Sequence, residues 1–444
     1  MKNILLCATV ILLFFSCKEE YFDGKLKKND LVLNGNELIK DEQDYGNDFG
    51  GFQISELFAA SNGNIYYRAL KYIDREIKNY ISEIGEMDIN GNMLWRCEPE
   101  KFRVYGLVED DHNNIYVYGS IMQGGEDKAC IGKIENQSVT VIYVDYIPPE
   151  GGITCNNFIS MKHESNGTFW WVGEIYGQHG VIGRVKITQD DVERTYYRME
   201  NWYYYGIYSL EKTEFDSYLI TYPISFKPSQ WGVERNEYTP GDFQRDQWYS
   251  KPIITDNTSN PNLESQSPFQ RNNICVKNGN DLVVVGYGDN AEGRTFTDNN
   301  SKIPRGIVAC LDYQTGAIKW KRTIPENNPE ISGTKAYQIF LHNNKYYVIG
   351  EYNYHSLAGE GGYFRRFGYG FVQTISLSGE LLDCYLFGKD LEGSCFYSAA
   401  IVGNKLLIAG YRGLKFSSDN EYNDLFVPYD GRKGWFVSCN IDDF

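Results

Sequence analysis

One arrangement of polar and apolar residues recurs along most of the chain: a polar turn, a short apolar run and, in most copies, a closing glycine. Asn114–Gly119 is a clear copy, with the sequence Asn-Ile-Tyr-Val-Tyr-Gly, and Thr168–Gly173 repeats its pattern. Short apolar runs bounded by Asn- and Gly-rich turns predict β-strands joined by tight connections. Seven copies follow one another at intervals of about 50 to 60 residues, and they end at Ala69, Gly119, Gly173, Tyr222, Gly286, Gly350 and Gly410.

Each repeat contains further short strands in a constant order. A second strand follows the first, as at Ile131–Ile134, and a third often follows a glycine turn, as at Gly316–Trp320. A fourth strand precedes the first, as at Ala336–Phe340. One small four-stranded sheet cannot bury both of its faces alone, whereas a ring of such sheets can. The sequence therefore predicts an all-β fold, a seven-bladed β-propeller, with rings of six or eight blades as the alternatives.

The last repeat has its inner strands but no outer one, because the chain stops soon after Ile441. Near the other end, Gly35–Lys40 has the same pattern as Gly91–Arg96, where an outer strand is expected. We therefore expect Leu38 and Ile39 to lie in an N-terminal outer strand that completes the last blade and closes the ring. On this interpretation residues 34–444 form a single propeller domain.

The first residues have the features of a targeting segment. Lys2 precedes the apolar run Ile4–Phe15, which is too short to span a bilayer. The sequence from Phe14 to Cys17 resembles a lipobox, a resemblance that implies cleavage of a signal peptide at residues 1–16 and lipid on Cys17. Lys18-Glu19-Glu20 resembles the surface-export signal of Bacteroidota lipoproteins. We expect residues 17–33 to be a polar tether, and the protein to be attached to the outer membrane and to face the cell exterior.

Composition and charge narrow the possible partners. The chain has 36 Tyr, 24 Phe and 8 Trp, which agrees with an all-β fold because aromatic residues favour strands. Its formal net charge of -16 disfavours nucleic acid as a partner, because an acidic surface repels phosphate backbones. An acidic surface is also not attracted to anionic lipid, and no second long apolar run follows. Membrane attachment is therefore expected to rest on the lipid at Cys17.

The chain offers no recognisable catalytic or metal-binding motif. Its five histidines are not paired at metal-ligand spacing, and no nucleophile elbow or Ser/His/Asp arrangement stands out. We therefore expect no catalytic residues, no metal and no cofactor. A non-catalytic binding or scaffold protein is favoured, and an extracellular glycan hydrolase or lyase on a propeller is the alternative.

One stretch carries a family resemblance. The segment Cys310–Trp320, with Asp312, Thr315 and Gly316 in its turn, resembles the repeat of quinoprotein-like propellers. The resemblance implies that the turn and Trp320 lock neighbouring blades together, which is a structural role and not a cofactor site. The overall pattern is similar to that of the surface propeller lipoproteins of Bacteroidota, whose ligands vary.

Three consecutive repeats have long connections after their first strand, namely Tyr287–Arg305, Glu351–Tyr369 and Tyr411–Lys433, and Pro223–Ser267 is a further long irregular stretch. Corresponding connections emerge on the same face of a propeller, and long loops often carry function. Aromatic rings and arginines suit a glycan or a protein ligand, although the rings could instead pack the loops onto the ring of blades. The hypothesis is one aromatic-lined site, and its expected contacts are Tyr354, Tyr363, Arg365, Arg366, Phe416 and Tyr422.

The anchor can be tested directly. If Cys17 carries the lipid, Cys17→Ala removes the attachment, because no second long apolar run is present to hold the membrane. The variant should move from the membrane fraction to the soluble fraction on cell lysis, as followed by immunoblotting. Unchanged fractionation would rule out this form of anchoring.

Overall fold

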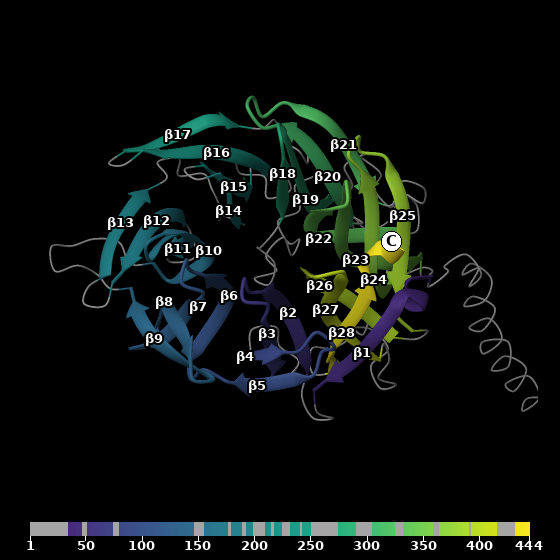
Figure 1. Ribbon diagram of the computed structural model, residues 1–444, viewed down its shortest axis with the longest axis horizontal. Helices are drawn as coiled ribbons and strands as arrows, with labels where there is room; N and C mark the ends of the chain where they lie inside the picture. Colours follow the sequence, from purple (N-terminus) through teal and green to yellow (C-terminus); the bar gives the residue numbers. More distant parts are fainter. Residues whose placement is uncertain are drawn as a thin grey trace, which may run out of the picture.

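The computed structural model describes residues 34–46, 51–73, 80–145, 155–175, 179–188, 192–198, 209–214, 217–223, 231–239, 242–249, 274–289, 304–324, 332–357, 364–389, 392–414 and 431–444. Within these residues the chain forms seven four-stranded antiparallel sheets. The sheets follow one another around a ring, with their first strands innermost (Figure 1). The predicted seven-bladed propeller is therefore confirmed.

The first six blades are simple meanders, in which each strand pairs with the next along the chain. Blades one to three are β2 (Phe52–Ala59), β3 (Ile65–Tyr72), β4 (Tyr80–Met87) and β5 (Met93–Cys97); β6 (Phe102–Glu109), β7 (Ile115–Gln123), β8 (Glu126–Glu135) and β9 (Ser138–Val144); and β10 (Asn157–Ser165), β11 (Thr168–Ile175), β12 (His179–Ile187) and β13 (Val192–Arg198). Blades four to six are β14 (Ser209–Glu214), β15 (Ser217–Pro223), β16 (Trp231–Thr239) and β17 (Asp242–Tyr249); β18 (Cys275–Asn278), β19 (Asp281–Asp289), β20 (Pro304–Asp312) and β21 (Ile318–Ile324); and β22 (Ser332–His342), β23 (Lys345–Leu357), β24 (Phe364–Ser376) and β25 (Leu381–Phe387).

Blade seven joins the two ends of the described chain. It contains β26 (Glu392–Val402), β27 (Lys405–Leu414) and β28 (Lys433–Asn440), and its outer strand is β1 (Ile39–Tyr45). Strand β1 runs antiparallel to β28, with Ile39 opposite Cys439 and Tyr45 opposite Gly434. The predicted closure by an N-terminal outer strand is confirmed.

The predicted limits of this closing strand were wrong. Gly35 to Leu38 lie in the 3-10 helix η1 (Asn34–Leu38), and the strand begins only at Ile39. The reason is local, because the side-chain amides of Asn34 and Asn36 bond to the backbone of β25 and of Gly388 just after it, and hold this segment out of the sheet. A second short helix, η3 (Ile441–Asp443), follows β28.

Parts of the predicted long loops are also strands. In blade six, β23 continues to Leu357 and β24 begins at Phe364, so most of the expected loop Glu351–Tyr369 is a hairpin of paired strands. In blade four, the stretch expected to be irregular contains β16 and β17.

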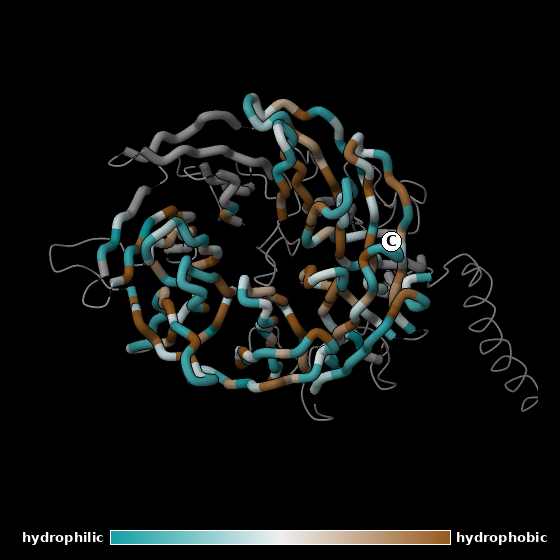
Figure 2. The backbone as a smooth tube through the Cα atoms, viewed as in Figure 1, coloured by the Kyte–Doolittle hydropathy of each residue, from teal (hydrophilic) through white to brown (hydrophobic). Residues whose placement is uncertain are grey.

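The hydrophobic core lies between neighbouring blades. One apolar cluster joins blades two and three around Tyr118 and Trp171, and another joins blades five and six around Val308 and Phe371. Further clusters join blade six to seven, seven to one, and one to two. Figure 2 shows the hydrophobic stretches running along the strands of adjacent blades. The blades that share these clusters thus bury apolar faces against one another, as the repeat pattern requires.

A β-bulge recurs in the innermost strand of several blades. In β22 the register shifts between Ala336 and Gln338, and in β26 it shifts between Phe396 and Ser398. The residue after the bulge then bonds to the next blade. Gln338 Nε2 donates to the carbonyl oxygen of Ala399 (3.1 Å), while Gln338 Oε1 accepts from the Ala399 amide (2.6 Å). Bulges therefore aim polar side chains across the seams between blades.

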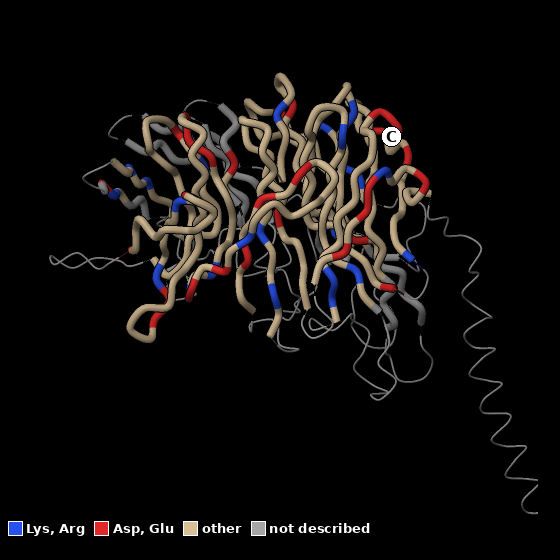
Figure 3. The backbone as a smooth tube through the Cα atoms, turned by 60° about the horizontal axis from the view of Figure 1, so that its bottom comes forward, with Lys and Arg blue, Asp and Glu red and all other residues tan. Residues whose placement is uncertain are grey.

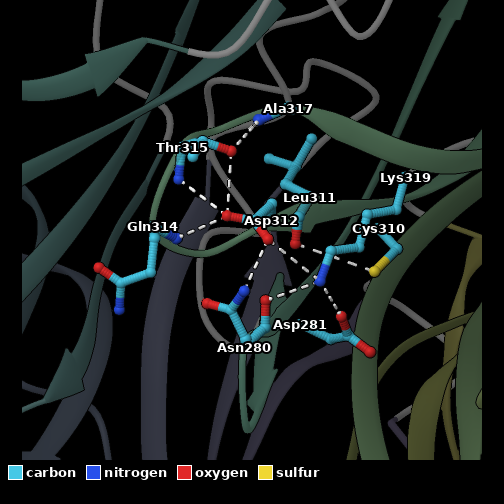
Figure 4. A network of polar contacts seen from close by, with 9 residues as sticks. All are labelled: Asn280, Asp281, Cys310, Leu311, Asp312, Gln314, Thr315, Ala317 and Lys319. Atoms are coloured by element: carbon cyan, nitrogen blue, oxygen red, sulfur yellow. Dashed lines mark hydrogen bonds and ion pairs between the residues drawn. The ribbon is translucent and has the colours of Figure 1, made fainter.

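The Asp312 turn is held by polar contacts within its own blade (Figure 4). Asp312 Oδ1 accepts hydrogen bonds from the amides of Gln314 and Thr315 and from the Thr315 hydroxyl. Asp312 Oδ2 accepts from Asn280 Nδ2 (2.6 Å), and Lys319 forms ion pairs with Asp281 and Asp312. All of these partners belong to blade five, so the turn fixes the connection between β20 and β21.

Trp320 makes the contact between blades. Its indole lies against the turn of blade six at Gly379, where an added Cβ would come within 2.5 Å of the ring. Gly379 has φ +84°, a conformation that favours glycine. A tryptophan on the outer strand thus packs onto a glycine turn of the following blade, as the resemblance implies.

This contact predicts unequal effects of two alanine substitutions. Gly63 has nearly the same backbone conformation, φ +89°, but no atom lies near its missing Cβ. Alanine at positive φ costs about 1–2 kcal/mol at either site. Gly379→Ala should cost a further 1–3 kcal/mol or so, because it overpacks the seam. Urea unfolding of both variants measures the difference, and equal losses would show that the Trp320 contact is unimportant.

Candidate functional site

The predicted site residues are only partly within the described chain. Tyr354 lies in β23, and Arg365 and Arg366 lie in β24, where they pair with Ser356 and His355. The structure thus brings these three positions together in one hairpin of blade six. The other expected positions lie outside the described residues: Cys17, Tyr363, Phe416 and Tyr422.

The three connections singled out in the sequence leave the same face of the ring. Each joins the second strand of a blade to the third: β19 to β20, β23 to β24, and β27 to β28. In a meander blade these connections alternate with the turns of the opposite face, so that they share one face in every blade. We call this the loop face.

A group of aromatic and charged side chains lies on the inner strands below the loop face. Tyr397 of β26 lies between Tyr337 of β22 and Tyr411 of β27, with ring centroids 5.5 Å and 5.7 Å apart. The guanidinium of Arg432, immediately before β28, lies 4.0 Å from the centroid of the Tyr411 ring. We call Tyr337, Tyr397, Tyr411 and Arg432 the tyrosine–arginine cluster.

The cluster spans the seams on both sides of blade seven. Tyr337 comes from blade six, and its hydroxyl donates to Glu351 Oε2 of β23 (3.2 Å). On the other side, Arg432 Nη1 donates to Gln53 Oε1 of blade one (2.6 Å), and the amide of Phe52 donates to the Arg432 carbonyl (2.8 Å). Three blades therefore contribute to one continuous group of polar and aromatic side chains.

The sequence places two of these tyrosines by the same device. Tyr337 and Tyr397 are the extra residues of the two bulges, in the stretches Ala336-Tyr337-Gln338 and Phe396-Tyr397-Ser398. A bulge redirects its extra side chain away from the regular alternation of the strand. The two tyrosines occupy equivalent positions when the innermost strands of the repeats are aligned. That signal lies outside the long connections from which the site was predicted.

Burial affects the pKa of one tyrosine of the cluster and of a neighbouring cysteine. It raises the pKa of the Tyr397 phenol well above its ordinary value, and it does the same for the Cys395 thiol beside it. Both groups are therefore neutral near pH 7, the phenol as a hydrogen-bond donor and the thiol as a small apolar group. Neither has the lowered pKa of an activated nucleophile. Tyr337, Tyr411 and Arg432 are buried, so the groups of the cluster that a ligand could reach are the half-buried Tyr397 ring and its hydroxyl.

The aromatics of the expected loops include residues that do pack the blades. Tyr352 is buried in the apolar cluster of blades five and six, and Tyr411 is buried in the tyrosine–arginine cluster. The structure supports a packing role for Tyr352. Arg412, from another of the expected loops, forms ion pairs with two carboxylates of β1.

Other buried charges belong to the seam between blades one and two. Arg68 forms an ion pair with Glu56 (3.4 Å) and donates to the Val104 carbonyl (3.2 Å). Burial raises the pKa of Glu83, which accepts from the Tyr67 hydroxyl (2.8 Å). These groups join strands and blades, as buried and paired charges commonly do.

The residues that the structure describes offer neither a metal cluster nor a membrane-spanning helix. No group of three or more His, Cys, Asp or Glu side chains in that part of the chain is placed to hold a metal ion. Within the same residues, no helix has the length and hydropathy needed to cross a membrane. Figure 3 shows acidic and basic positions intermixed over the described wall of the ring.

The chain matches no protein-family model and no curated protein. Several solved structures are similar to it in fold. The Dos1 propeller has 10% sequence identity and a TM-score of 0.43, over 86% of this chain and 77% of that one. The β-propeller domain of the Trilobed protease from Pyrococcus furiosus has 11% identity and a TM-score of 0.41, over 85% and 98%. The polysaccharide lyase Uly1 has 11% identity and a TM-score of 0.47, over 91% and 100%. These similarities assign no activity to this chain.

Proposed function

We propose that this chain is a lipid-anchored propeller of the cell envelope that binds a glycan or a protein ligand at its loop face without transforming it. The observation that carries the proposal is the tyrosine–arginine cluster, which joins blades six, seven and one. It lies at the same face as the β23–β24 hairpin with Tyr354, Arg365 and Arg366.

The chemistry of the cluster suits recognition. Tyrosine rings offer flat apolar faces together with a polar hydroxyl, and arginine offers directional donors, which is why both are enriched at binding hot spots. The Glu351 carboxylate adds an acceptor next to Tyr337. A sugar presents apolar C–H faces and hydroxyl groups, and a protein loop presents comparable groups, so either ligand could stack on the half-buried Tyr397 ring and bond to its hydroxyl.

The raised pKa values favour binding over nucleophilic catalysis at this place. A nucleophilic tyrosine or cysteine needs a lowered pKa or an adjacent base. Burial has the opposite effect on Tyr397 and Cys395. The alternative, a glycan hydrolase or lyase, would need catalytic groups other than these two.

The proposed location rests on the N-terminal sequence. The apolar run Ile4–Phe15 ends next to Cys17, and Lys18-Glu19-Glu20 follows it. With lipid on Cys17 and this charged segment as an export signal, the propeller would lie outside the outer membrane. Its loop face could then meet glycans or proteins at the cell exterior.

The proposal can be tested by screening the purified protein against arrays of glycans and of envelope proteins, with both retention and product release recorded. Tyr363→Ala and Arg366→Ala should each weaken binding about thirtyfold, as expected for a hot spot worth about 2 kcal/mol. Tyr397→Phe should also weaken binding, because this variant loses the hydroxyl that would bond to the ligand, although it keeps the ring. Melting temperatures should change little, since substitutions outside the core usually cost under about 0.5 kcal/mol and Tyr397→Phe keeps its ring.

Arg96→Ala is the matched control, because Arg96 is an exposed arginine on the outer strand of blade one. It should leave binding unchanged. Release of a cleaved product would replace the binding hypothesis with the enzymatic one. Retention that is the same in all four variants would place the ligand elsewhere on the propeller.

A further inference from the structure

Residues Asn34–Tyr45, which we call the strap, contact three successive blades. The strap consists of η1 and β1, and it lies along the outside of the ring from blade six past blade seven (Figure 1). Its contacts differ in kind from those that hold the other blades together.

At blade six the strap is held by two asparagines. Asn34 Nδ2 donates to the Cys384 carbonyl (3.3 Å), and Asn34 Oδ1 accepts from the Leu386 amide (3.1 Å). Asn36 makes the same pair of bonds with the backbone of Gly388, at 2.8 Å and 3.1 Å. Both amide side chains thus bond to the backbone at β25 as a short additional strand would.

At blade seven the strap is held mainly by charge. Arg412 of β27 forms ion pairs with Glu42 and Asp44, and Lys405 forms one with Asp41 (3.0 Å). The Ser438 hydroxyl donates to Asp41 (2.6 Å), and together with Lys405 it lowers the pKa of that carboxyl. The negative charges of β1 are therefore matched by cations that reach across β28.

The strap buries little apolar surface. In β1 no residue is fully buried, and half-buried and exposed positions alternate. In its partner β28, by contrast, most positions are buried. Opening of a segment whose apolar side chains are only partly buried costs less than opening of the core strands. The strap is therefore held by one strand pairing, two asparagines, the charged contacts and the partial burial of Leu38, Ile39 and Tyr45.

Two neighbouring residues connect the strap to the tyrosine–arginine cluster. Tyr411 and Arg412 are consecutive in β27, so their side chains point to opposite faces of the sheet. Tyr411 packs against Arg432 in the cluster, whereas Arg412 holds Glu42 and Asp44 of the strap. Tyr45, at the end of the strap, also donates to the Gly91 carbonyl of blade one.

We propose that the strap is a latch: it opens as a unit while the other blades stay folded, and its docking holds the seam between blades seven and one on which the cluster is built. This goes beyond the proposed binding function and does not depend on which ligand binds. The strap is the two-state element, docked or undocked. Arg412 transmits its state through β27 to Tyr411 and, across the seam, to Arg432 and the start of β2.

Hydrogen–deuterium exchange of the full chain, followed by mass spectrometry, tests the latch. In the wild-type protein the amides of Ile39–Tyr45 should exchange faster than those of the inner strands β3 and β7. Arg412→Gln should speed exchange of Ile39–Tyr45 by about tenfold or more, because charge-assisted hydrogen bonds are lost. Exchange of Phe52–Ile54, at the start of β2, should rise with it. Exchange in β7 should not change.

Lys319→Gln is the matched control, since it removes a lysine that also bridges two carboxylates, in blade five. It should leave the strap unaffected. Asp44→Asn weakens the same ion pairs from the strap side, and it replaces Arg412→Gln in the experiment if that variant does not fold. The proposal is overturned if Ile39–Tyr45 exchange at the same rate as β7 in all proteins. It is also overturned if the strap accelerates without Phe52–Ile54, or if the Lys319 variant behaves like the Arg412 variant.

Discussion

The structure depends on the packing of each four-stranded sheet against its two neighbours. A single blade leaves two apolar faces exposed, and only a closed ring covers both faces of every blade. The apolar clusters follow this constraint, because each is shared between adjacent blades. The seam between blades seven and one is special, because blade seven is itself built from both ends of the described chain. Its apolar contacts come from Phe52, Ile54 and Phe436, and its outer strand is held by charge.

The same constraint positions the candidate site. A bulge in β22 and another in β26 place Tyr337 and Tyr397 next to each other, and the bonds of Gln338 across the seam fix their relative position. Arg432 then joins this pair to blade one through Gln53. A recognition surface built on the rigid inner strands loses less conformational entropy on binding than one built from loops alone. In the proposed function this wall supports the residues of the connections.

The fold could be predicted from the sequence because each repeat corresponds to one blade. Seven apolar runs, most of them ended by a glycine, define seven blades, and the Cys310–Trp320 stretch correctly indicates a turn and an interblade tryptophan. The closing strand was placed too early in the chain, since Lys40-Asp41-Glu42-Gln43-Asp44 lacks the apolar alternation of a strand. Its partners, Lys405 and Arg412, lie more than three hundred residues away in sequence, and no local pattern reveals them.

The candidate site was harder to predict for a related reason. The long connections drew attention to their own aromatic residues, and Tyr354, Arg365 and Arg366 proved to lie in paired strands of blade six. Arg432 gains its role from a tyrosine that precedes it by one connection and from a glutamine in another blade. Such contacts follow from ring closure, so they appear only once the blades are assembled.

The most direct test of the closed ring compares the thermal unfolding of two shortened chains, one beginning at residue 34 and the other at residue 46. Both lack the N-terminal segment that precedes the strap, and only the second lacks the strap itself. The account predicts that the first melts like the chain beginning at Cys17. The second should melt several degrees lower or fail to fold, because β28 becomes an exposed sheet edge and the seam loses its outer strand. Equal melting temperatures for the two shortened chains would contradict it.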